Sequence, residues 1–141
     1  MRKIILFMLM FSGLLTGCQL ESEELSIKEV GMSDISKRAT EFFEGIEMHK
    51  MEKGNGIYIF NESENSRYIY LNQDFLEPGK MFGEADILHN EDSLEIYLSD
   101  KDETEEELEQ YKIYEIKQYE EYEYLRIFKN NEETYFHIIG L

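Results

Sequence analysis

The only cysteine of the chain, Cys18, stands where it could receive a covalent modification. Arg2 and Lys3 open the chain, an apolar run extends from Ile4 to Leu15, and two small residues separate that run from the cysteine. A basic start, a short apolar run and small residues before a cut are typical of a secretory signal peptide. The run is shorter than the roughly 20 apolar residues that a membrane-spanning helix needs, so we predict an export signal and not a membrane span.

The four residues Leu15, Thr16, Gly17 and Cys18 resemble the lipobox of bacterial lipoproteins. This resemblance implies that a diacylglyceryl group is attached to the Cys18 thiol and that signal peptidase II cuts the chain before this residue. Two acyl chains suffice for stable anchoring, because each buried methylene contributes about 0.8 kcal/mol. The alternatives are an ordinary signal peptide with a chance cysteine and an uncleaved N-terminal anchor. We expect a protein held by lipid on the extracytoplasmic face of the cell membrane.

A second candidate site lies in the densest acidic run, from Asp100 to Glu109. Asp100, Asp102 and Glu106 offer carboxylates at spacings that resemble a calcium-binding loop, although the glycine at the sixth position of an EF-hand loop is missing. Such a loop could bind calcium weakly outside the cell. The alternatives are a solvated loop, which the charge density favours, and a docking patch for a basic partner.

The remaining residue types give no sign of catalysis. His49, His89 and His137 show no paired spacing of the kind that zinc sites on a helix use, and no Gly-x-Ser-x-Gly motif marks a serine nucleophile. If the cysteine carries lipid, it cannot act as a nucleophile. We therefore predict no catalytic residue and no cofactor.

Length and charge limit the class of protein. Removal of residues 1–17 leaves enough chain for one domain but too little for two. The formal net charge is −17, and it becomes more negative by two when Arg2 and Lys3 are removed. Such a surface repels the phosphates of nucleic acids, so we expect no nucleic-acid partner. The exported chain would hold no second cysteine, which excludes an internal disulfide.

Three segments follow from the sequence pattern. Residues 1–17 are expected to form the signal peptide, 18–32 a lipidated cysteine with an acidic tether, and 33–141 a single mainly-β domain with an N-terminal helix. The tether is predicted from acidic residues without a sustained apolar period. An alternative is that a stripe containing Leu25 and Ile27 docks on the domain.

Apolar residues at three- and four-residue steps predict an amphipathic helix from Ser33 to about Met51. Ser33 or Asp34 would cap its start, and the glycines of Gly54-Asn55-Gly56 would end it. The stripe that contains Phe42, Phe43 and Ile46 is expected to pack across a sheet, and the alternative is that it docks a partner.

Beyond this helix the apolar period changes to two, which is typical of strands. The pattern predicts seven strands at residues 57–60, 67–71, 85–89, 94–98, 111–117, 122–129 and 134–139. Asn130 and Asn131 are expected to form a turn, because asparagine tolerates positive φ. Short strands with short turns favour an antiparallel meander, closed by the helix into a small barrel or a strongly curved sheet.

The order of helix, Asn55-Gly56-Ile57-Tyr58, Tyr70-Leu71-Asn72 and a final tyrosine-rich hairpin resembles the small uncharacterised lipoproteins of the Gram-positive cell envelope. The expected barrel is similar to the calycin-like barrels of exported lipoproteins. These resemblances bring no catalytic residues with them. The predicted lipid anchor and the charged, tyrosine-rich strands favour a membrane-anchored, non-enzymatic binding or accessory module that contacts another envelope protein. The alternatives are a small-barrel carrier of an apolar ligand and an envelope enzyme of unrecognised type.

Overall fold

The structure, a computed structural model, describes residues 24–49 and 53–141. Its strands are β1 (Ser26–Val30), β2 (Ile57–Asn61), β3 (Ser66–Leu71), β4 (Lys80–Asn90), β5 (Ser93–Asp102), β6 (Lys112–Lys117), β7 (Tyr124–Lys129), β8 (Glu132–Thr134) and β9 (Ile138–Gly140). Its helical elements are the 3₁₀ turns η1 (Met32–Asp34) and η2 (Gln73–Phe75) and the α-helix α1 (Lys37–Met48). The fold is α+β and mainly β, as the sequence pattern predicts.

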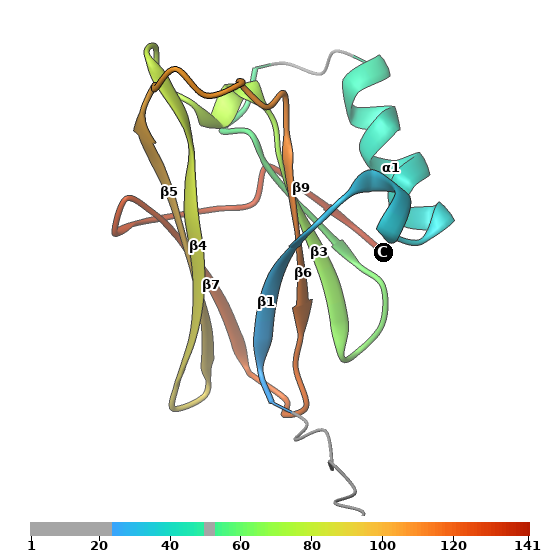
Figure 1. The fold of residues 1–141 in the computed structure, drawn as a ribbon. Coiled ribbons are helices and arrows are strands. Elements are labelled where there is room, and N and C mark those ends of the chain that lie inside the picture. Colours follow the sequence, from blue (N-terminus) through green and yellow to red (C-terminus); the bar gives the residue numbers. More distant parts are fainter. Residues whose placement is uncertain (1–23, 50–52) are drawn as a thin grey trace, which may run out of the picture.

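The strands form two sheets that face each other, and α1 covers the outer side of the larger one (Figure 1). The five-stranded sheet has the order β1-β6-β3-β2-β9, and the four-stranded sheet has the order β4-β5-β7-β8. The molecule therefore has three layers, which are the four-stranded sheet, the five-stranded sheet and the helix.

The prediction of an antiparallel meander closed into a small barrel is wrong. Both sheets are open and mixed, because β2 pairs in parallel with β9 and β5 pairs in parallel with β7. Parallel neighbours need long connections, and here the chain passes through the other sheet between the two partners. A local alternation of apolar residues reveals the strands but not this long-range pairing.

The five-stranded sheet is the central layer, so both of its faces are buried. In β2, Ile57 and Ile59 face the four-stranded sheet, whereas Tyr58 and Phe60 belong to the cluster beneath the helix. Successive side chains of a strand point to opposite faces, and a strand covered on both sides is therefore apolar throughout. The space between the two sheets is filled by a continuous cluster of buried apolar side chains.

The helix begins later than expected. Ser36, not Ser33 or Asp34, is the N-cap, and its hydroxyl accepts a hydrogen bond of 3.1 Å from the backbone N–H of Ala39. The earlier residues form η1 instead, and His49 caps the helix at its other end. The predicted end at Met51 lies outside the described residues.

The expected tether at 18–32 is wrong for residues 26–30, which form β1. This strand pairs with β6 along its whole length, from Ser26 opposite Lys117 to Val30 opposite Ile113. Leu25 and Ile27 pack against the cluster between the sheets, in agreement with the alternative in which this stripe docks on the domain. The signal peptide, the lipobox and Cys18 lie outside the described residues.

The remaining strand predictions hold with adjusted ends. The hairpins β2–β3 and β4–β5 are present, and β4 begins earlier than predicted, at Lys80. Asn130 and Asn131 form the β7–β8 turn at φ 50° and 67°, as predicted. The last predicted strand is two strands, β8 and β9, which belong to different sheets. No helix among the described residues is long and apolar enough to span a membrane.

Candidate functional site

A groove of about 780 Å³ lies between α1 and the end of the five-stranded sheet. The helix contributes one wall through residues spaced three and four apart, the strands β2 and β3 contribute the floor, and η2 and the end of the acidic loop contribute the opposite wall. The apolar and aromatic part of its lining consists of Met32, Phe43, Ile46, Met48, Tyr58, Tyr70 and Tyr111. The groove thus joins elements that are far apart in the sequence.

Three aromatic rings stack along the groove. The Tyr70 ring lies between Phe43, at a centroid distance of 4.9 Å, and Tyr111, at 5.5 Å. Phe43 is fully buried, whereas Tyr111 is 37% exposed and has only one ring face covered by this stack. The faces of the inner rings are therefore used within the protein, and the groove presents ring edges and methionine side chains to a ligand.

Glu47 is the polar centre of the groove. Its Oε1 accepts hydrogen bonds from the Tyr70 hydroxyl at 2.9 Å and from the Asn72 amide at 3.4 Å. Burial raises the pKa of Tyr70, and the hydrogen bond to Glu47 and its negative charge raise it further. Burial also raises the pKa of Tyr58, with a contribution from the negative charge of Asp74. Both tyrosines therefore stay neutral, and the Tyr70 hydroxyl acts as a hydrogen-bond donor and not as a base.

The acidic loop is fixed to the groove by one side chain. The amide of Gln73 donates hydrogen bonds to the backbone oxygens of Glu109, at 3.0 Å, and Gln110, at 2.9 Å. In Figure 1 this loop crosses from β5 to β6 at the end of the molecule where η2 lies. These two hydrogen bonds of Gln73 hold Tyr111 beside Tyr70 and so define the width of the groove.

The charged residues of the lining give the groove a net negative charge. Among the described residues, three carboxylates and one lysine face it, and these are Glu44, Glu47, Asp74 and Lys53. The carboxylates come from α1 and from η2, on opposite sides of the groove. A cationic group placed between them would be attracted from both walls.

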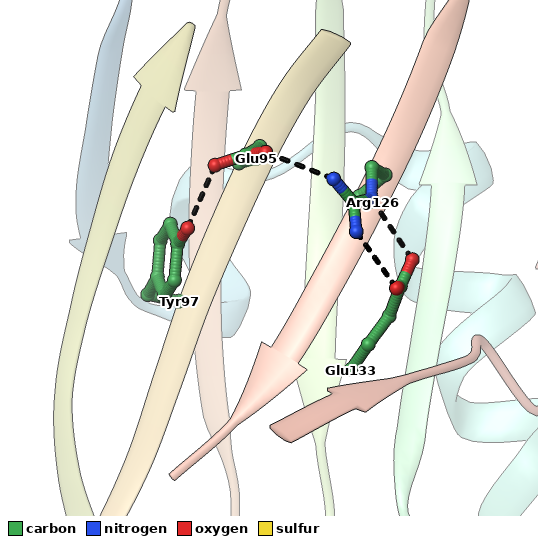
Figure 2. Close-up of polar contacts among 4 residues, drawn as sticks. All are labelled: Glu95, Tyr97, Arg126 and Glu133. Atoms are coloured by element: carbon green, nitrogen blue, oxygen red, sulfur yellow. Dashed lines mark hydrogen bonds and ion pairs between the residues drawn. The ribbon is translucent and has the colours of Figure 1, made fainter. Parts of the chain in front are cut away.

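A second polar arrangement lies on the outer face of the four-stranded sheet (Figure 2). Arg126 bridges two glutamates: its Nη1 donates to Glu95 at 3.2 Å, and its Nε and Nη2 donate to both oxygens of Glu133 at 2.9 and 2.8 Å. Glu95, with a side chain only 8% exposed, also accepts from the Tyr97 hydroxyl at 2.7 Å. These groups satisfy one another, so the cluster fastens β5, β7 and β8 together and is a structural network.

The Glu133 ion pair makes a prediction about acid stability. The hydrogen bond from Arg126 lowers the pKa of Glu133 below its ordinary value of 4.5. A lowered folded-state pKa stabilises the fold above the ordinary value, and the effect disappears as the pH falls through the lowered pKa. We expect Glu133→Gln to lower the urea midpoint at neutral pH and to leave it unchanged in strong acid. Glu132→Gln, at the neighbouring position of β8, serves as the control and should show no such pH-dependent difference.

Two of the three residues predicted to bind calcium lie beside lysines. The Asp100 carboxylate is 3.8 Å from Lys129 Nζ, and Asp102 accepts a hydrogen bond of 2.7 Å from Lys80. Glu106 lies in the loop beyond β5. No group of three or more metal-binding side chains is present in the part of the chain that the structure describes. The calcium site stays a prediction.

A second hollow of the described surface is a poorer candidate than the groove. It measures about 920 Å³ and runs along β1 and β6. Lys112 bonds there to Glu29 at 2.9 Å and to Glu109 at 2.8 Å, and Lys28 lies 3.5 Å from Glu115. Its lysines are thus paired with carboxylates of the protein itself. Residues with ligand-binding capacity are therefore concentrated in the groove beside α1.

The sequence predicted one wall of the groove, as the apolar stripe of the helix, without predicting a groove. The helix stripe was expected either to pack on a sheet or to dock a partner, and Phe43 and Ile46 are indeed buried on the sheet, while Met48 is 78% exposed at the groove. Glu47 and Tyr111 were not recognised, since no local spacing connects a helix residue with a loop residue. Comparisons of the chain with protein-family models, with curated proteins and with solved structures found no match.

Proposed function

We propose that this chain is a non-enzymatic binding module of the cell envelope, tethered to the extracytoplasmic face of the membrane through lipid on Cys18. Its partner, an envelope protein, binds at the groove beside α1. One observation carries the binding role: an open groove places exposed apolar side chains next to carboxylates from two walls. The lipobox residues Leu15, Thr16 and Gly17 support the tether.

The protonation and the hydrogen bonds of the polar side chains favour binding over catalysis. Burial raises the pKa of Tyr58 and of Tyr70 and so keeps both hydroxyls neutral, and the Tyr70 hydroxyl donates a hydrogen bond to Glu47. Among the described residues, no histidine side chain forms a hydrogen bond with a serine, threonine or carboxylate, so no nucleophile with an adjacent base is in place. The interior between the sheets is filled by apolar side chains, which favours the groove over an internal ligand cavity.

The tether predicts a change in detergent partition. We expect Cys18→Ala to move the protein from the detergent phase to the aqueous phase of Triton X-114, because the substitution removes the thiol that would carry both acyl chains. Wild-type protein made in the same cells is the control. Unchanged partition of the variant would contradict the lipid attachment.

The role of the groove can be tested by cross-linking in intact cells. A photoreactive amino acid at Met48, which is 78% exposed at the groove, should give a product with one defined envelope protein, identified by mass spectrometry. The matched control is the same amino acid at Leu88, which is 52% exposed on β4 of the other sheet. Equal products from both positions, or none from Met48, would contradict the groove as the binding surface.

A further inference from the structure

We infer that the groove binds a basic peptide segment of a partner chain, one in which lysine or arginine residues alternate with apolar residues. This inference rests on the proposed function and names the chemistry of the ligand. Two properties of the groove carry it, its apolar wall and the placement of its charges.

The apolar wall of the groove can accept aliphatic side chains of a ligand. Met32 and Met48 both line the groove, and methionine adapts its shape to different apolar partners because it is unbranched and polarisable. The inner aromatic rings stack on one another, so only the outer face of Tyr111 is available for stacking. A planar sugar ring would find little aromatic surface here, whereas an aliphatic side chain can use the methionines and the ring edges.

The charged residues of the groove favour a ligand that carries a cationic group. Glu44 and Glu47 face the groove from α1, and Asp74 faces it from η2, with Lys53 as the one positive charge among the described residues of the lining. A lysine or arginine that enters between the walls can approach carboxylates on both sides. The formal net charge of −17 adds long-range attraction, which raises the rate at which a basic segment arrives.

The experiment uses the full chain in nanodiscs of phosphatidylcholine, with empty nanodiscs as the background. The probe is a short fluorescent peptide of alternating leucine and lysine, and its binding is measured by anisotropy. The groove variant combines Glu44→Gln, Glu47→Gln and Asp74→Asn. The control variant combines three exposed substitutions of equal charge change, Glu91→Gln, Glu120→Gln and Glu121→Gln, in the β4–β5 turn and the β6–β7 loop, away from the groove lining.

We expect the groove variant to bind the peptide about tenfold more weakly than wild type, because three exposed charge pairs each contribute a modest amount. The control variant should change the affinity by less than about twofold. A peptide with serine in place of leucine should bind more weakly than the original to wild type. Thermal unfolding of each variant confirms that a loss of binding does not come from a loss of folding. A second groove variant combines only Glu44→Gln and Asp74→Asn, and it keeps the hydrogen bonds that Glu47 accepts.

Three results would overturn the inference. They are no binding to wild type, equal losses in the groove and control variants, and displacement of the peptide by a neutral oligosaccharide. If any of these occurs while the Met48 cross-link and the detergent partition persist, the ligand class is wrong and the proposed function stands. If the Met48 cross-link is also absent, the groove itself is wrong.

Discussion

Phe43→Ala is expected to lower the free energy of unfolding by about 3 to 5 kcal/mol, because it removes a large buried side chain and leaves a cavity. Phe43 is 0% exposed, and its ring stacks on Tyr70 at 4.9 Å with an interplanar angle of 16°. It belongs, with Ala39 and Ile46, to the buried cluster that joins α1 to the central sheet. A loss of this size is a large share of the 5 to 15 kcal/mol, roughly, that stabilises a small domain.

Urea unfolding of the exported chain, followed by circular dichroism, measures the effect. The matched control is Met48→Ala on the same helix, where the side chain is 78% exposed and the expected change is within about 0.5 kcal/mol. Equal midpoints for Phe43→Ala and wild type would show that the helix is not part of the cooperative core. The groove would then have one movable wall.

Gly56→Ala is expected to cost about 2 to 5 kcal/mol, from left-handed strain and from overpacking together. Gly56 has φ +74°, and a Cβ atom there would lie 2.1 Å from the backbone nitrogen of Phe75. Backbone atoms of η2 cannot move aside as a flexible side chain can. The substitution should therefore displace η2, which carries Asp74 at the groove.

Gly79→Ala separates the two contributions. Gly79 has nearly the same φ, +77°, but a Cβ atom there would meet nothing within 4 Å. Its expected cost is the left-handed strain alone, about 1 to 2 kcal/mol. Both variants are compared with wild type in the same urea titration. A loss in Gly56→Ala no larger than that in Gly79→Ala would contradict the close approach of η2.

The sequence predicted those parts of the fold in which neighbouring residues decide the structure. The apolar runs of β2 and β3 marked a hairpin, and the Asn130-Asn131 pair marked the turn between β7 and β8, because the backbone there needs positive φ. Strands that are apolar on both faces, as β2 and β3 are, do not fit the one-sided alternation of a sheet with one exposed face. The structure explains them instead by the central position of the five-stranded sheet between two apolar clusters.

The parts that sequence reasoning did not predict depend on distant contacts. β1 is short and carries lysine and glutamate, so its strand character comes from pairing with β6 and not from its own residues. The parallel pairs arise from connections that leave one sheet and return. The groove brings together Glu47 from the helix and Tyr111 from the loop, and only the folded chain reveals that arrangement.

The strand order of the larger sheet also determines when the domain can fold. β1 and β9, the first and last strands of the described chain, are its two edges, and β1 gains its hydrogen bonds only when β6 is available. Folds dominated by such distant pairings fold in about milliseconds to seconds, slowly for a domain of this size. If the chain is exported as proposed, it would remain extended while it passes through the membrane. The larger sheet would then form only after β6 and β9 have emerged from the membrane.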